Sequence, residues 1–112
     1  MTTTAHKRVL MNARALISSR AHWTRSKLAC TADGRRVEPH DPSAAKWCAM
    51  GAILRAAHDL VGDGEEARRI GDAIDKRICP TLWFLGGLPA INDVRGHAAV
   101  LAVFDKGLQA EQ

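Results

Sequence analysis

A thiol nucleophile with a histidine base is the sharpest chemistry that this sequence offers. Cys48 lies near the middle of the chain, and His97 and Asp93 lie near its C-terminal end. Covalent catalysis by cysteine needs a thiolate, a proton acceptor and a group that orients the imidazole. Cys48, His97 and Asp93 would fill these three roles, with His58 and Asn92 as substitutes. A cysteine-dependent hydrolase or transferase is therefore one interpretation.

The predicted position of Cys48 in a helix argues against this chemistry. Asp41 before Pro42 predicts a helix start, with Asp41 as the N-cap and Pro42 at the first helical position. The helix dipole can lower a thiol pKa only within the first helical turn, and Cys48 would lie beyond that turn. We expect Cys48 to be a small buried side chain, and we favour a protein that is not an enzyme.

The chain has no pattern typical of a metal or cofactor site. Cys30, Cys48, Cys79, His58 and His97 are zinc-ligand types, but none has the close spacing of a zinc motif. An odd number of widely spaced cysteines favours reduced thiols over a disulfide framework. We expect no metal, no cofactor and a cytoplasmic location.

A ligand-binding site is predicted at the start of the last helix. Asn92 or Asp93 would cap this helix, and Arg95 and His97 would lie in its first turn. A helix N-terminus can bind an anion such as phosphate. We expect a small anionic ligand or a protein partner here. The predicted neighbourhood comprises Trp23, Trp47, Asn92, Asp93, Arg95 and His97.

The positive charge is concentrated in the N-terminal half. Residues 1–56 contain ten Lys/Arg and three Asp/Glu, whereas residues 57–112 contain six and nine. Basic side chains on an extended ribbon could follow a phosphate backbone without reading its sequence. Nucleic-acid binding is therefore a further alternative. The residues concerned are Arg20, Arg25, Lys27, Arg35 and Arg36.

Length and composition predict a single domain, residues 1–112, with its own apolar core. Apolar residues make up 46% and charged residues 25%, which is ordinary for a folded domain. No apolar run is long enough to cross a bilayer, and the N-terminus lacks the apolar core of a signal peptide. We expect no contact with membranes and either a monomer or a homodimer.

The hydrophobic periodicity predicts a mainly α (α+β) fold: a compact four-helix domain with one short β-hairpin after the first helix. The helices are expected at 5–19 after a Thr4 cap, from Asp41 to Gly62, from an Asp63 cap to Cys79, and from Asn92 or Asp93 to Leu108. The hairpin is expected within 23–37, around Asp33-Gly34.

Side-chain patterns on these elements predict the core. The central helix should bury Trp47, Met50, Gly51, Leu54, His58 and Val61, and Gly51 should meet a closely packed neighbour. Residues 81–91 should form a loop that places Trp83 and Phe84 in the core. The last helix should bury Val94, His97, Val100, Leu101, Phe104 and Leu108.

Four short motifs carry a family resemblance. They are His22-Trp23-Thr24, Asp33-Gly34-Arg35, Asp41-Pro42-x-Ala44-x-x-Trp47-Cys48-Ala49-x-Gly51-Ala52 and Asn92-Asp93-x-x-Gly96-His97. With these motifs the chain resembles, over most of its length, an uncharacterised family of small proteins from bacteria and their phages. The resemblance implies no particular activity. It implies an origin in mobile elements, and hence an accessory, regulatory or counter-defence protein.

Overall fold

The computed structural model describes residues 3–80 and 85–110, and five α-helices dominate this part of the chain. The mainly helical fold is confirmed, but the described residues form five helices and not the four predicted. The helices are α1 (Thr3–Leu16), α2 (Ala49–Val61), α3 (Gly64–Ile78), α4 (Gly87–Arg95) and α5 (His97–Ala110). A short 3-10 helix η1 (Arg20–His22) and two strands, β1 (Ala29–Cys30) and β2 (Lys46–Trp47), lie between α1 and α2.

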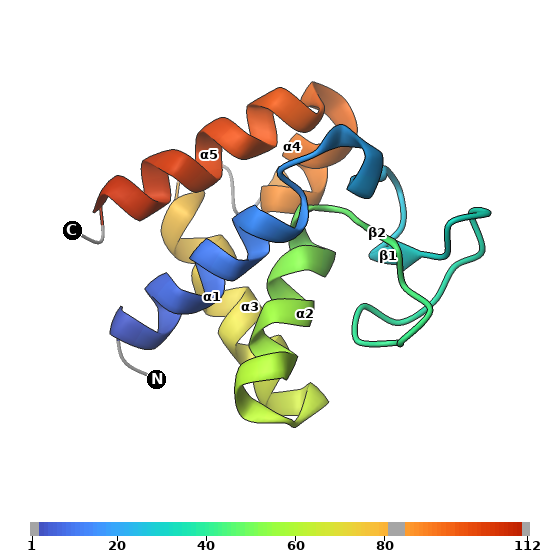
Figure 1. The fold of residues 1–112 in the computed structure, drawn as a ribbon. Helices are drawn as coiled ribbons and strands as arrows, with labels where there is room; N and C mark the ends of the chain where they lie inside the picture. Colours follow the sequence, from blue (N-terminus) through green and yellow to red (C-terminus); the bar gives the residue numbers. More distant parts are fainter. Residues whose placement is uncertain (1–2, 81–84, 111–112) are drawn as a thin grey trace.

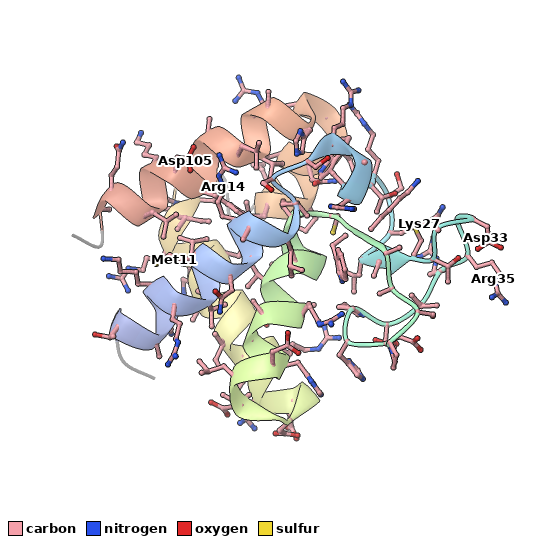
Figure 2. All side chains as sticks on the ribbon, viewed as in Figure 1. Met11, Arg14, Lys27, Asp33, Arg35 and Asp105 are labelled. Atoms are coloured by element: carbon pink, nitrogen blue, oxygen red, sulfur yellow. The ribbon has the colours of Figure 1, made fainter. Side chains whose placement is uncertain are left out.

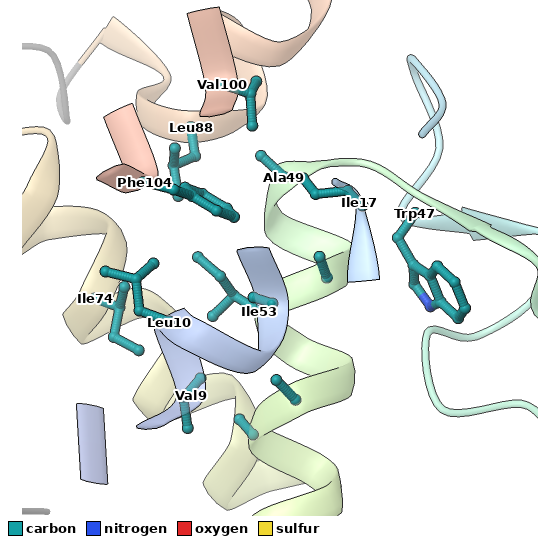
Figure 3. Close-up of a cluster of buried hydrophobic side chains, with 14 of the residues drawn as sticks. Val9, Leu10, Ile17, Trp47, Ala49, Ile53, Ile74, Leu88, Val100 and Phe104 are labelled. Carbon is teal, nitrogen blue, oxygen red and sulfur yellow. The ribbon is translucent and has the colours of Figure 1, made fainter. Parts of the chain in front are cut away.

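Helix α2 is the centre of the helical bundle. It packs against α1, α3 and α4, while α5 crosses α1 and also contacts α3 and α4 (Figure 1). Aliphatic and aromatic side chains from all five helices meet between them (Figure 3). Alanines along α2 are also buried, which allows its neighbours to approach closely. The fully buried large side chains include Val9, Ile17, Ile53, Ile74 and Phe104.

The predicted apolar stripe of the first helix is confirmed, although its ends differ. Helix α1 already includes Thr4, so that residue is not its cap, and the helix ends at Leu16. Val9, Leu10 and Ala13 are buried as expected. Arg14 forms an ion pair with Asp105 of α5 (2.9 Å), which joins the first and last helices at the surface (Figure 2).

Helix α2 begins after Cys48, so the predicted start at Asp41 was wrong. The Asp41 carboxylate accepts hydrogen bonds from the Ser43 N–H (2.8 Å) and the Ser43 hydroxyl (2.6 Å), which closes a local turn. The chain then extends through β2, and Cys48 takes the N-cap conformation at φ −79° and ψ 178°. Asp41 therefore stabilises a turn that precedes the helix.

The predicted buried face of the central helix was only partly right. Met50 and Gly51 are buried, but Leu54, His58 and Val61 are only half-buried, because the alanine-rich side of α2 faces the bundle. Gly51 does meet a close neighbour: a Cβ at this position would overlap the carbonyl group of Leu28. Only glycine lets this loop backbone lie directly on the first turn of α2.

Residues 20–47 form an arm that projects from one side of the bundle (Figure 1). Strand β1 pairs antiparallel with β2, with Ala29 opposite Trp47 and Cys30 opposite Lys46. The predicted turn at Asp33-Gly34 is present, and a bridge joins Cys30 to Arg36 beside it. However, the paired strands are not both within 23–37, because β1 lies between the returning segment 35–37 and the later segment 45–48.

The C-terminal region contains two helices where one was predicted. Helix α4 starts at Gly87, within the predicted 81–91 loop, and Gly96 at φ +91° separates it from α5. Asn92 and Asp93 therefore lie inside α4 and cap no helix. Val94 was expected to be buried but is 81% exposed, whereas Val100 and Phe104 are buried as predicted. Trp83 and Phe84 lie outside the described residues.

The start of α4 depends on a side chain from another helix. The buried Asp75 of α3 accepts a hydrogen bond from the Leu88 N–H (2.9 Å), so it caps α4 across the bundle. Burial raises the pKa of the Asp75 carboxyl, partly opposed by this N–H group. Gly87 has φ +57°, and a Cβ there would lie 2.6 Å from both carboxylate oxygens.

Candidate functional site

Asn92 is the centre of a buried hydrogen-bond node that joins the arm to the bundle. Its side chain is fully buried, and Oδ1 accepts hydrogen bonds from Trp23 Nε1 (2.6 Å) and the Ala49 N–H (2.9 Å). Its Nδ2 donates to the Thr24 carbonyl (3.0 Å) and to Asp93 Oδ1 (3.1 Å). Two acceptor and two donor positions are therefore all used. One amide fixes the start of the arm, the start of α2 and the body of α4.

Asp93 extends this node to the basic segment of the arm. Its Oδ1 accepts a hydrogen bond from the Ser26 N–H (2.9 Å), and Ser26 has the left-handed φ of +64°. The Asp93 carbonyl accepts from Arg25 Nη1 (2.6 Å), and the Arg25 guanidinium lies 5.1 Å from the centre of the Trp23 ring. Asp93 therefore holds a strained backbone position and its neighbouring arginine in place.

His97 contacts both Ile17 and the Trp23 ring. Its Nε2 lies 2.6 Å from the Ile17 carbonyl oxygen, and its ring centre lies 5.5 Å from that of Trp23. The histidine therefore joins the start of α5 to Ile17, the residue that follows α1. The structure brings Trp23, Asn92, Asp93 and His97 together. Their side chains form hydrogen bonds to other groups of the protein in this region.

The Trp47 ring and Arg95 lie outside that cluster, although the Trp47 carbonyl accepts a hydrogen bond from the Thr24 N–H. Trp47 is buried, and its Nε1 donates to the Pro39 carbonyl (2.9 Å) on the far part of the arm. Arg55 of α2 lies over the Trp47 ring at 5.5 Å and also donates to the Pro39 carbonyl (3.4 Å). Figure 3 shows the Trp47 ring set apart from the centre of the helical core. Arg95 is exposed at the end of α4 and lines a different cavity, near Cys79 and α5.

Cys48 is buried, as expected, but at a different helical position from the one predicted. Its Sγ accepts a hydrogen bond from the Gly51 N–H (3.3 Å) as the N-cap of α2. Burial raises the pKa of the Cys48 thiol, and nearby Asp93 adds to that rise, although backbone N–H groups oppose it. The protonated thiol is therefore favoured at neutral pH.

A cavity of about 210 Å³ lies beside Cys48 and Asp93. Lys27 and Arg36 also line it, together with Ser26, Leu28 and Pro89, and no described histidine does. His97 bonds to Ile17 instead. The described arrangement therefore gives Cys48 a carboxylate neighbour without a histidine base beside the same cavity, which does not fulfil the geometry that thiol catalysis needs.

The five basic residues predicted for nucleic-acid binding all lie on the arm. Arg25 is bound to α4, Lys27 Nζ donates to the Gly34 carbonyl (3.1 Å), and Arg36 Nη2 approaches the Ser26 carbonyl (3.5 Å). Arg20 is exposed, and the Arg35 side chain is 79% exposed, with Asp33 3.9 Å away. Figure 2 shows Lys27, Asp33 and Arg35 at the outer end of the arm.

This basic segment contains the net charge of the whole chain. Residues 20–36 include five Lys/Arg and one Asp, a net charge of +4. The whole chain has 16 Lys/Arg and 12 Asp/Glu, so eleven of each remain elsewhere. The positive field of the protein therefore originates in one segment outside the bundle.

Sequence reasoning missed two contacts that position the arm and α4. His40 of the arm stacks on His58 of α2, with ring centres 4.2 Å apart and planes 9° apart. Asp75 caps α4, and no local sequence signal marks a cap supplied by another helix. Among residues 3–80 and 85–110, no group of three or more His, Cys, Asp or Glu side chains could hold a metal ion.

One family of proteins covers nearly the entire chain. The model of the family of unknown function DUF6197 matches residues 1–110. The chain belongs to this family. This agrees with the predicted membership of an uncharacterised family, and DUF6197 carries no assigned activity. No curated protein and no solved structure matches the chain. None of the helices within the described ranges has the length and apolar character needed to cross a membrane.

Proposed function

We propose that this DUF6197 member is a non-enzymatic binding protein that presents the basic segment of its arm, residues 20–36, to an anionic partner. The observation that carries the proposal is the location of the charge: the whole net charge of +4 lies in this segment. Attraction between this segment and an anion would raise the association rate and fix the orientation of the complex.

The use of the motif residues favours binding over catalysis. Asn92 makes four hydrogen bonds within the protein, and the Asp93 carboxylate holds Ser26. Cys48 caps α2 with a thiol whose pKa is raised by burial. The polar groups of these residues are therefore used in hydrogen bonds that hold the arm and α2 in place.

The arm is also held in one shape before a partner arrives. Its backbone bonds include Thr24 N to Trp47 O (3.1 Å), Thr31 N to Arg35 O (2.8 Å), and Ala45 N to Cys30 O (2.8 Å). Asp33 and Thr31 share a further side-chain hydrogen bond within the turn. A prearranged surface loses less conformational entropy on binding than a flexible one, which favours a recognition role.

Charge-matched variants test this proposal. Arg20→Gln with Arg35→Gln removes two exposed charges from the arm, whereas Arg8→Gln with Lys106→Gln removes two exposed charges from α1 and α5, outside the arm. On a heparin column, the arm variant should elute at clearly lower salt than the control variant. Equal elution of the two variants would contradict the proposal, because their net charges are the same.

Thiol labelling tests the enzymatic alternative. All three cysteines are buried, and the Cys48 thiol has no histidine beside its cavity. We therefore expect iodoacetamide near neutral pH to modify Cys48 no faster than Cys30 or Cys79, as followed by peptide mass spectrometry. Selective and rapid modification of Cys48 would instead favour a cysteine-dependent hydrolase or transferase.

A further inference from the structure

We infer that the anionic partner of the arm is the phosphate backbone of a nucleic acid, bound without sequence preference. This inference rests on the proposed function and specifies its partner. It draws on three observations about the arm: the cations do not converge on one pocket, the surface offers no large exposed apolar side chain, and the two tryptophan rings are buried.

The two cavities lined by basic residues of the arm do not suit a compact anion. Lys27 and Arg36 line the cavity of about 210 Å³, but the Asp93 carboxylate lines it too. A second cavity, of about 470 Å³, also includes Arg36, and Glu38 and Asp41 line that one. A phosphate ion or a small carboxylate would therefore meet an acidic side chain in either place. The cations are instead distributed along residues 20–36, which suits an extended polyanion.

The arm also lacks the anchors that a protein partner usually needs. Binding energy in protein interfaces is concentrated in large side chains that become desolvated. Trp23 and Trp47 are already buried. Among the described residues, the exposed large hydrophobic side chains are Met11, Leu60, Leu85 and Val94, and none of these belongs to the arm. Phosphate contacts need charge and hydrogen-bond donors, which the arm does provide.

The identity of the basic residues fits phosphate. Four of the five are arginines, whose planar guanidinium can bind two phosphate oxygens at once. Arg25 and Arg36 are positioned by backbone carbonyls of Asp93 and Ser26. Because the Trp23 ring is buried against Arg25 and His97, it cannot stack on a base without leaving its place. Recognition should therefore depend on the backbone and not on base identity.

A salt titration with labelled DNA tests the inference. Fluorescence anisotropy would follow a short fluorescein-labelled duplex and a scrambled duplex of the same length from about 50 mM to about 200 mM salt. With three to five phosphate contacts, log K should fall against log salt with a slope of about −2.7 to −4.5. Both duplexes should bind equally, and poly-L-glutamate of equal total charge should compete at least tenfold more weakly than unlabelled duplex.

The same charge-matched variants identify the surface. Arg20→Gln with Arg35→Gln should weaken duplex binding about tenfold or more at about 50 mM salt and make the slope shallower by about 2. Arg8→Gln with Lys106→Gln should stay within about twofold of the natural chain. Circular dichroism and thermal melting would establish that both variants are folded.

The possible failures separate the two proposals. If poly-L-glutamate binds the arm as tightly as duplex, or if one duplex is clearly preferred, the inference is overturned and the proposed binding of an anionic partner is retained. If neither polymer binds at low salt, both proposals fail. If the arm variant and the control weaken binding equally, the arm is not the binding surface and both proposals fail as well.

Discussion

The bundle and the arm are stabilised in different ways. In the bundle, apolar side chains such as Ile53 and Phe104 are buried between helices, and burial itself supplies the stabilisation. The arm has two short strands, and it is fixed by hydrogen bonds to a few buried polar groups, above all Asn92. The difference teaches that apolar packing stabilises the bundle, whereas the position of the basic segment depends largely on the hydrogen bonds of Asn92 and Asp93.

Removing the largest fully buried side chain should have the largest effect, and it should act on both regions together. Phe104 is fully buried, so Phe104→Ala should lower the free energy of unfolding by about 3–5 kcal/mol in urea denaturation. Val94→Ala, at an exposed apolar position, should change it by less than about 0.5 kcal/mol. A loss for Phe104→Ala no larger than that of Val94→Ala would mean that the core is elsewhere.

Removing the Asn92 amide should affect the arm more than the bundle. Asn92→Ala leaves Trp23 Nε1 and the Ala49 N–H unpaired, at about 1–2 kcal/mol each, so a loss of about 2–4 kcal/mol is expected. Hydrogen exchange should accelerate more in the arm than in α1 and α5. Asn12→Ala, which alters an exposed asparagine of α1, should neither lower the stability by this amount nor accelerate hydrogen exchange in the arm. Uniform acceleration across the chain would show that Asn92 has no special role in fixing the arm.

The contact between His40 and His58 should have a smaller, local effect. The stack joins the outer part of the arm to α2, so His58→Ala should lower stability by about 0.5–1 kcal/mol. The amide resonances of residues 38–41 should shift in NMR spectra, while those of α5 remain in place. His22→Ala, an exposed histidine on η1, is the matched control. Equal spectral changes at residues 38–41 in both variants would argue against the stack.

The smallest expected effect is a change in pH dependence within the bundle. Burial raises the pKa of the Asp75 carboxyl above the value of 3.8 for an unperturbed aspartate, so the folded state binds this proton more tightly than the unfolded state does. This contribution to stability is complete below about pH 4 and is lost as the pH rises through the folded pKa.

Asp75→Asn should remove that pH-dependent loss while an amide oxygen still accepts from the Leu88 N–H. Relative to the natural chain, the variant should therefore gain stability between about pH 4 and pH 7 in urea denaturation at a series of pH values. Glu65→Gln, at an exposed position on the same helix, provides the comparison. A constant difference between Asp75→Asn and the natural chain across this range would contradict a raised pKa.

The sequence predicted the bundle better than the arm because the signals of the bundle are local. The stripe of Val9, Leu10 and Ala13 repeats within one helix, and Asp63 caps α3 by accepting from the Glu66 N–H (3.1 Å), three residues away. The start of α2 was misplaced because Asp41-Pro42 is a strong local signal for a helix start, yet Asp41 forms a turn with Ser43.

The interior of the site depends on partners that are distant in sequence. Asn92 and Asp93 were identified as important from their motif, but the cap role predicted for them assumed that they begin a helix. Asp75 caps α4 from α3, which moves the helix start to Gly87. The basic residues of segment 20–36 were all named from the sequence. That they contain the entire net charge, and that the motif holds them in place, required the three-dimensional arrangement.

The long reach of Asn92 has a consequence for synthesis of the chain. Trp23 and Ala49 donate to an acceptor that lies 69 and 43 residues further along. A nascent polypeptide must therefore emerge from the ribosome through α4 before these two donors can find their acceptor, whereas α1 and α2 can form earlier from local bonds. Closure of the arm therefore waits for α4 to be made, and a truncated product that ends before α4 would display its arginines on an unfixed loop.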